Sequence, residues 1–385
     1  MSNSFFNIAV NPVTRDDNLV AAQIWFLKGT KDEPYKKNGM FHLVEHLLIA
    51  SNPFEQDWFA KKHFTGTTSQ EVVKFGFICE KDKILVNLRQ LFKYILKIPI
   101  TKEILSLQKR KVINEIQYRK EVDFFQFLDA GLDVVFKEST YSNCSGGEIQ
   151  TVEALGYDEI KKYWNILFEN TPFRLSIVGK LQIEEVADIY AIYQENNKKY
   201  NDYNLSKIAI DEHLLLNKVY ITSESRAAMF FFKGPGKIEQ SYVYLKIIEI
   251  LLNQCIDSYY MVRTSAISYH AIGFILLFVR EENFKRVEEI KNLVIEIINN
   301  ISKLNMAVNL LCHELMLYQQ DIAFQAQQNM ERGLFGYNVL DIIQKTPRDI
   351  LLNELKEFAL KLFLKRNVCL IQSDKTNKND LDIWT

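Results

Sequence analysis

Residues 38–50 of the chain read NGMFHLVEHLLIA, an apolar segment that carries two histidines and a glutamate. Apolar residues surround the helix that this segment would form, so we expect it to be buried. His42 and His46 are four residues apart, and Glu45 comes three residues after His42, so the three side chains share one face. Burying these groups without partners is costly, and a metal ion removes most of that cost. Zinc suits histidine and carboxylate ligands.

A third protein ligand must come from another segment. The order His-x-x-Glu-His inverts the His-Glu-x-x-His zinc motif, and two histidines are one ligand fewer than a catalytic zinc usually has. The best candidate is Glu115, in a helical pattern that begins near Lys102. It lies close to the apolar stripe of that helix, which is an unfavourable position for a carboxylate that has only water as a partner. Two alternatives stay open: His42 and His46 as hydrogen-bonded core histidines, and Glu115 as a surface residue of a charged helix.

The chain also contains an internal repeat. Residues 21–29, AAQIWFLKG, resemble residues 227–234, AAMFFFKG, and both are strand-like aromatic runs that end in Lys-Gly. A polar loop and an apolar segment of helical length follow each run, at residues 40–50 and 242–252. Next come a strand-like segment and an amphipathic helix in each half, at residues 75–78 and 81–98, and at 272–275 and 281–298. The repeated order indicates two related halves.

The repeat predicts an α+β fold of two homologous halves, each a mainly antiparallel sheet with helices packed on one face. We place the zinc-binding half at residues 1–195, a polar linker at 196–208 and the homologous C-terminal half at 209–385. The alternative is one large α+β domain in which the similarity arose by chance.

Composition excludes several classes of protein. Lys and Arg total 47 against 48 Asp and Glu, so there is no global basic field for a nucleic acid or an anionic membrane. Five scattered cysteines without a Cys-x-x-Cys pair indicate reduced thiols. The N-terminal residues do not resemble a secretory or mitochondrial leader, and no apolar run reaches the ~20 residues of a membrane span. We therefore expect a cytoplasmic protein without a membrane span.

The segment from Gly39 to His46, taken with Glu115, resembles the pitrilysin/insulinase family of inverted zincin metallopeptidases. The size and the two halves resemble the short branch of that family, which includes proteins similar to mitochondrial processing peptidase and bacterial zinc peptidase subunits. The resemblance covers most of the chain. Supporting matches are Thr68, Phe75, Gly147 and residues 174–179.

The resemblance implies a zinc-dependent endopeptidase that cleaves peptides or unfolded polypeptide segments. Zinc would be held by His42, His46 and Glu115, and Glu45 would be the general base that accepts a proton from a zinc-activated water and passes it to the leaving amine. In the family, substrates add as a strand beside the first sheet. The edge at residues 65–69 is the expected docking site, with Thr67 and Thr68 as substrate-binding residues.

Two departures from the family pattern concern residues around the expected site. The family carries an Arg and a Tyr in its second half that position substrate, and Arg263 and Tyr269 match them with a spacing of six residues, one fewer than usual. The alternative is that Arg263 is a surface charge and Tyr269 a packing aromatic. Gln108 stands where family members often have a Glu, and an amide cannot act as an acid or base.

The short branch builds its catalytic chamber from two chains, so the resemblance implies a homodimer or a heterodimer with a related subunit. In a dimer, Arg263 and Tyr269 would act at the zinc site of the other chain. Some short bacterial relatives process precursors of ribosomally made peptide antibiotics, so a bacteriocin-type precursor is one substrate that the analogy suggests. The alternative function is a non-catalytic peptide-binding or assembly subunit of a heterodimeric peptidase.

Overall fold

The structure of the protein is a computed structural model, which describes residues 18–97, 100–137, 139–197, 218–257, 262–364, 368–376 and 381. The chain divides into two compact units. The first comprises Met1–Arg119, Ser139–Asn204 and Tyr318–Gly336, and the second comprises Lys120–Glu138, Leu205–Leu317 and Tyr337–Thr385. Of the predicted linker, residues 198–208 lie outside the described residues.

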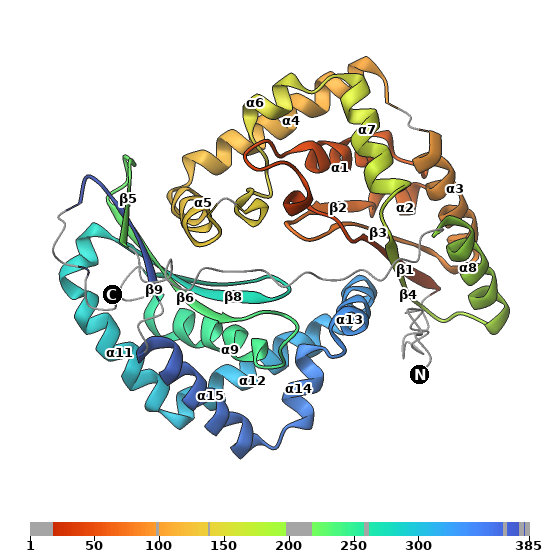
Figure 1. The fold of residues 1–385 in the computed structure, drawn as a ribbon. Helices are drawn as coiled ribbons and strands as arrows, with labels where there is room; N and C mark the ends of the chain where they lie inside the picture. The colour runs from red at the N-terminus through yellow and green to blue at the C-terminus, as the bar shows by residue number, and fades with distance from the viewer. Residues whose placement is uncertain are drawn as a thin grey trace. The chain divides into compact units, whose positions relative to one another are not determined.

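The first unit is built on a four-stranded antiparallel sheet (Figure 1). Its strands, in spatial order, are β2 (Thr65–Thr68), β3 (Val73–Glu80), β1 (Leu19–Phe26) and β4 (Phe173–Val178). The central strand β1 is apolar along most of its length because side chains on both of its faces are buried. The predicted edge segment, residues 65–69, is confirmed as the outermost strand β2.

One face of this sheet packs on a large apolar core that includes Ile24, Phe26, Phe75 and Phe77. The helices of the unit are α1 (Met40–Ser51), α2 (Trp58–Lys62), α3 (Ile84–Lys97), α4 (Lys102–Glu121), α6 (Ile149–Ala154), α7 (Tyr157–Phe168), α8 (Ile183–Asn196) and α13 (Ile322–Phe335). The helix predicted at residues 81–98 begins as a 3-10 turn at Lys81–Lys83 before α3.

Helix α13 lies on the opposite face of the first sheet. Its Ile322 and Ala326 pack against Ala21 of β1 and Val178 of β4. Arg174 of β4 donates a hydrogen bond from Nη1 to the Gly333 carbonyl oxygen at 2.7 Å. A segment far along the chain therefore covers the face that the core helices leave open.

The second unit contains a five-stranded sheet, again mainly antiparallel. Its strands, in spatial order, are β5 (Lys218–Ile221), β9 (Val368–Ser373), β6 (Ala227–Pro235), β8 (Ile272–Arg280) and β7 (Arg263–Ser268). Only β5 and β9 are parallel. The order β7-β8-β6-β9 repeats the order β2-β3-β1-β4 of the first sheet, so the predicted α+β fold with two related sheets is confirmed.

The helices of the second unit are α5 (Asp123–Val135), α9 (Tyr242–Leu252), α11 (Val287–Asn299), α12 (Ile301–Tyr318), α14 (Val339–Lys345) and α15 (Arg348–Leu364). Most of them enclose a core with Phe230, Phe232 and Leu277 from one face of the sheet. Helix α5 covers the other face, where Gly131 lies so close to the Phe231 ring that a Cβ atom on the glycine would be 2.0 Å from a ring carbon.

The two units are not two uninterrupted stretches of chain. Helix α5 follows α4 in sequence but packs on β6 and β9, and α13 follows α12 but packs on β1 and β4. These helices occupy corresponding places in the repeat. Each half of the sequence therefore contributes one helix that packs on the sheet of the other half. A division at 1–195 and 209–385 separates the two sheets but assigns α5 and α13 to the wrong compact unit.

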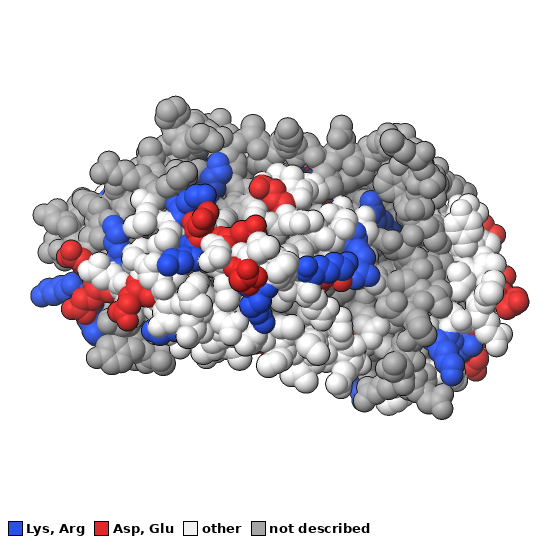
Figure 2. Space-filling model, turned by 90° about the horizontal axis from the view of Figure 1, so that it is seen from below, with Lys and Arg blue, Asp and Glu red and all other residues white. Residues whose placement is uncertain are grey.

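Charge is mixed on the face of the molecule that Figure 2 shows, where Lys and Arg side chains are interspersed with Asp and Glu. This distribution is in keeping with the formal net charge of −1. Among the described residues, no helix combines the length and the apolar character that crossing a membrane requires.

Candidate metal centre

The His-x-x-Glu-His motif lies on α1, whose start is fixed by a buried carboxylate. Gly39 precedes the helix with a φ of +120°, a conformation that favours glycine. The side chain of Glu33 accepts hydrogen bonds from the backbone N–H groups of Gly39 at 2.8 Å and Phe41 at 2.5 Å. Glu33 is 1 % exposed, and burial raises its pKa to about 7 against the lowering effect of these bonds. Glu33 thus satisfies helix donors that would otherwise be buried without partners.

His42, His46 and Glu115 meet as the sequence predicts. The Nε2 atoms of His42 and His46 lie 3.5 and 3.4 Å from Oε2 of Glu115, which comes from α4. The histidine side chains are 13 % and 16 % exposed, whereas Glu115 is 55 % exposed. One ligand atom of each residue lies within 4.8 Å of the other two.

This spacing suits a zinc ion. With zinc–ligand bonds of roughly 2.0–2.2 Å and tetrahedral angles, two ligand atoms on one ion lie about 3.4 Å apart. The two histidine-to-carboxylate distances, 3.5 and 3.4 Å, match that separation. The donor set of two imidazoles and one carboxylate also matches the ligands that zinc takes at catalytic sites. The residues present therefore fit a zinc ion.

The imidazole of His42 is oriented by a hydrogen bond on the side of the ring away from Glu115. Its Nδ1 lies 2.8 Å from the carbonyl oxygen of Gly146, so Nδ1 donates and Nε2 is left to face Glu115. Partners of this kind fix the tautomer and direction of metal-binding histidines. Gly147, with a φ of +98°, lies against Gly39, and the N–H of Glu148 donates to the Asn38 carbonyl at 2.9 Å. The loop of residues 143–148 therefore holds both the helix start and the ring.

Asn143 connects that loop, through hydrogen bonds, to the segment before α1. Its Nδ2 donates to the carbonyl oxygens of Thr30 at 2.8 Å and Glu33 at 3.2 Å, and its Oδ1 accepts from the N–H of Lys36 at 3.0 Å. Neither Glu33 nor Asn143 is predicted from the sequence as part of the site. A carboxylate a few residues before a helix that starts after a glycine is a signal that could have identified Glu33. The sequence around Asn143 contains no comparable signal for its role.

Glu45 lies beside the ligand group without belonging to it. It is 7 % exposed, and its Oε2 accepts a hydrogen bond from the Thr68 hydroxyl at 3.1 Å. Gly66 of β2 approaches so closely that a Cβ atom there would be 2.7 Å from Glu45 Oε1. Thr67 is exposed and its hydroxyl donates to the Gly66 carbonyl at 2.8 Å. The edge strand β2 thus passes directly over this carboxylate.

The titrating groups influence one another. Burial raises the pKa of Glu45, although the nearby His42 opposes the rise. Burial would lower the pKa of His42, but its bonds to Glu115 and to the Gly146 carbonyl raise it overall. The pKa of Glu115 is lowered, chiefly through His42, and that of His46 is lowered, chiefly by burial. Gln108 is 4 % exposed and forms a hydrogen bond with His46, so the amide supports a ligand.

Arg263 and Tyr269 lie in the second unit, at the start of β7 and just beyond its end. Arg263 is exposed, and its guanidinium carbon lies 3.9 Å from the centre of the Phe124 ring. Tyr269 is buried, and its ring meets that of Phe136 edge-on at 5.5 Å. Their predicted part in substrate binding stays a prediction. Helix α9, which corresponds to α1 in the repeat, carries no histidine.

The chain matches no family model, and no curated protein matches its sequence. Solved structures do match its fold. The peptidase M16 inactive domain from Pseudomonas fluorescens has a TM-score of 0.74 at 12 % identity, covering 97 % of this chain and 96 % of that one. A protease from Helicobacter pylori has a TM-score of 0.72 at 11 % identity, covering 92 % and 94 %.

The periplasmic protease PqqL from Escherichia coli matches with a TM-score of 0.63 at 11 % identity, and the match covers 92 % of this chain and 45 % of PqqL. At these identities the similarity is one of fold. The chain has the fold of the M16-like peptidases, the pitrilysin fold, in agreement with the resemblance seen in its sequence.

Proposed function

We propose that the protein is a zinc-dependent endopeptidase that cleaves peptides or unfolded polypeptide segments. The observation that carries this proposal is the convergence of His42, His46 and Glu115 at zinc-ligand spacing beside the buried Glu45. The fold similarity to M16-like peptidases supports the same class of activity.

His42, His46 and Glu115 would hold the zinc ion. Zinc bound there would act as a Lewis acid, making water acidic enough to lose a proton near neutral pH. Glu45 is the proton acceptor in this proposal. Its Oε2 is occupied by the Thr68 hydroxyl, so Oε1 is the oxygen that takes the proton and later delivers it to the leaving amine. Thr68 holds the carboxylate in place while it does so.

The substrate would bind as an added strand at β2. This strand is the outermost one of the first sheet, and Gly66 and Thr68 place it against Glu45. A peptide paired with the β2 backbone would be held mainly by main-chain hydrogen bonds, which give affinity with weak sequence preference. Thr67, exposed on the same strand, would contact the substrate directly.

We further propose a chamber made by two subunits, either identical or related, in the cytoplasm. PqqL, of which this chain matches 45 %, supports the idea that two such chains make one complete enzyme. In that arrangement Arg263 and Tyr269 serve the metal centre of the other subunit.

The test is the variant Glu45→Gln, assayed with zinc on an unstructured fluorogenic peptide. Glutamine keeps the shape and the bond to Thr68 but cannot accept a proton, so we expect full zinc content and a loss of cleavage of at least about 100-fold. Glu103→Gln, an exposed glutamate at the start of α4, is the matched control and should cleave at the parental rate. Cleavage by Glu45→Gln at the parental rate would show that Glu45 is not the base.

A non-catalytic subunit is the second candidate function. It is favoured by the similarity to the peptidase M16 inactive domain and by the amide of Gln108 beside His46. The two functions differ in one result. Zinc bound at one equivalent without turnover, either alone or with a related subunit, supports the non-catalytic function, whereas turnover supports the peptidase.

A further inference from the structure

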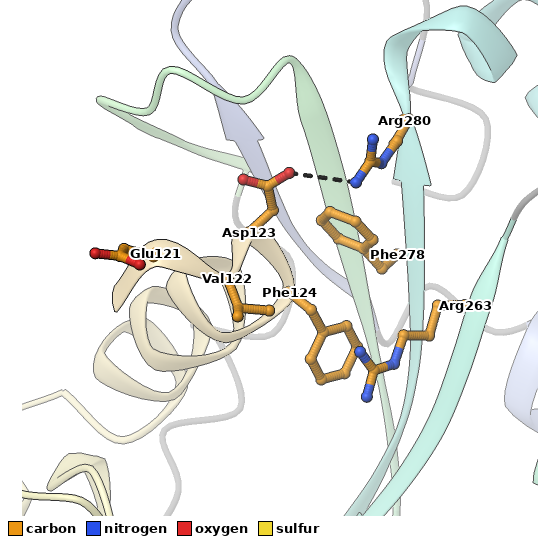
Figure 3. Close-up of a pocket in the computed structure, with 7 residues that line it drawn as sticks. All are labelled: Glu121, Val122, Asp123, Phe124, Arg263, Phe278 and Arg280. Atoms are coloured by element: carbon orange, nitrogen blue, oxygen red, sulfur yellow. Dashed lines mark ion pairs between the residues drawn. The ribbon is translucent and has the colours of Figure 1, made fainter. Parts of the chain in front are cut away.

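The second unit contains a pocket of its own, with a volume of about 330 Å³ (Figure 3). Aromatic walls and two arginines shape it: Phe124 from the start of α5, Phe278 and Arg280 from β8, and Arg263 from β7. Asp123 lies at its rim. Of these residues only Arg263 has a part in the proposed function, as a substrate-binding residue that serves the metal centre of another subunit, and none of them is a proposed zinc ligand.

The strand register places these side chains together. Arg263 of β7 is directly opposite Phe278 of β8, so the two share one face of the sheet. Arg280 comes two residues after Phe278 and projects to that same face. The rings of Phe124 and Phe278 meet edge-on at 5.9 Å, so the start of α5 forms one wall of the pocket against the sheet.

The two arginines differ in their charge partners. Arg280 Nη2 lies 3.5 Å from Asp123 Oδ2, so these charges offset each other. Arg263 makes no ion pair with any described residue, and Glu121, the remaining acid of the lining, points away from it in Figure 3. The pocket therefore keeps one cation without a counter-charge.

The guanidinium of Arg263 is held in place by stacking. Its central carbon lies 3.9 Å from the centre of the Phe124 ring. A stacked guanidinium loses little further side-chain freedom on binding, and the N–H groups along its edge stay available for a planar, two-oxygen acceptor. Next to it, Phe124 and Phe278 offer an apolar surface.

We propose that this pocket binds a carboxylate of a peptide, with Arg263 donating to both carboxylate oxygens and the two phenylalanines contacting the adjacent apolar side chain. A single unpaired cation suits a singly charged group better than a phosphate. The volume is at the small end of ligand sites, roughly 300–1,000 Å³, and admits one residue or two. The inference rests on the proposed function only in taking the ligand to be a peptide. The carboxylate can be the C-terminus or an Asp or Glu side chain.

The experiment measures peptide binding by fluorescence anisotropy with the full-length Glu45→Gln protein, so that no cleavage occurs. Three versions of one unstructured peptide are compared: with a free C-terminal carboxylate after a leucine, with a C-terminal amide, and with every Asp and Glu replaced by Asn and Gln. We expect one of the two neutralised versions to bind roughly tenfold more weakly, because an arginine–carboxylate bond is lost. Which version weakens identifies the source of the carboxylate.

The same peptides are then tested on Arg263→Gln and Arg263→Lys. We expect Arg263→Gln to bind all three versions equally weakly, and Arg263→Lys to keep part of the discrimination through its charge. Arg226→Gln is the matched control, since Arg226 is an exposed arginine of the same unit paired with Glu281, and it should behave as the parent does.

Equal binding of all three peptides by the parent overturns the proposal, as does unchanged discrimination by Arg263→Gln. A parent that prefers a phosphorylated peptide over the carboxylate peptide overturns it in favour of phosphate. Discrimination should persist in zinc-free protein, so failure of the metal centre and failure of this pocket give different results.

Discussion

At the scale of single residues, the candidate centre separates the groups that we propose to hold zinc from the group that we propose to move a proton. His42, His46 and Glu115 converge, while the Glu45 carboxylate is held aside by the Thr68 hydroxyl. Both roles come from one short motif, because residues three and four apart in a helix share a face without pointing at the same atom. Gly66 passes so close to the Glu45 carboxylate that any residue with a Cβ atom at position 66 would clash with it.

Glu115 is the ligand that the sequence supports least directly, so it merits its own test. Glu115→Ala removes one of three protein ligands, and we expect zinc affinity to fall by more than about 100-fold, since loss of outer partners alone costs roughly 10–100-fold. The fold should persist because Glu115 is 55 % exposed. Zinc titration against a chelating indicator measures the change.

Glu103→Ala on the same helix is the matched control and should bind zinc as the parent does. An unchanged zinc affinity in Glu115→Ala would remove Glu115 from the ligand set.

At the scale of elements, helix α1 depends on a loop that is distant in sequence. Residues 143–148 orient His42 through the Gly146 carbonyl, and Gly147 lies against Gly39 at the helix start. Glu33 completes the arrangement by accepting from the first turn. The direction in which the ligands point is thus set by two segments that contribute no ligand themselves.

Gly147→Ala tests this coupling. A Cβ atom at Gly147 would lie 2.5 Å from the Cα of Gly39, and the φ of +98° is unfavourable for alanine. We expect the free energy of unfolding to fall by at least about 2 kcal/mol and zinc affinity to fall with it. Chemical denaturation of the metal-free protein and zinc titration are the measurements.

The neighbouring Gly146→Ala serves as control, because its Cβ would meet nothing closer than 3.6 Å and it keeps the carbonyl that faces His42. It should change the free energy of unfolding by less than about 0.5 kcal/mol. Equal effects of the two substitutions would contradict the coupling.

Many of the helices and strands could be predicted from the sequence. The periodic segments at residues 40–50 and 242–252 are the helices α1 and α9, and the aromatic runs ending in Lys-Gly are the strands β1 and β6. Apolar periodicity and motif spacing are local signals, so they place these elements correctly and predict that His42, His46 and Glu115 lie together. Glu33 and Asn143 act through contacts between distant segments, and no periodic pattern reports such contacts.

At the scale of the whole molecule, the exchange of α5 and α13 is the feature that the sequence did not reveal. Both helices are amphipathic segments of ordinary length, and nothing in their own sequences indicates which of the two sheets each one packs on. The exchange leaves neither sheet covered by a single uninterrupted stretch of chain. On the face of the first sheet away from the core, apolar residues such as Ala21 and Val178 are buried by a helix from the other half of the sequence.

This interdependence predicts one cooperative unfolding transition rather than two. Melting of either sheet frees a helix whose chain runs directly into a helix of the other unit, α4 into α5 and α12 into α13. Unfolding of one unit should therefore disturb the other, so neither unit should remain folded alone. Scanning calorimetry of the metal-free protein should give equal calorimetric and van't Hoff enthalpies. Two separate transitions, or a calorimetric enthalpy about twice the van't Hoff value, would show that the units fold independently.

The proposed function depends above all on one zinc ion bound between α1 and α4. The most direct measurement is a crystal structure of the zinc-loaded Glu45→Gln protein with anomalous data collected at the zinc edge. We predict a single strong anomalous peak in this centre, from a zinc ion bonded to Nε2 of His42, Nε2 of His46 and the carboxylate of Glu115, with residue 45 outside the coordination sphere. An empty centre in crystals that contain ample zinc, or these side chains turned away from one another, would contradict it.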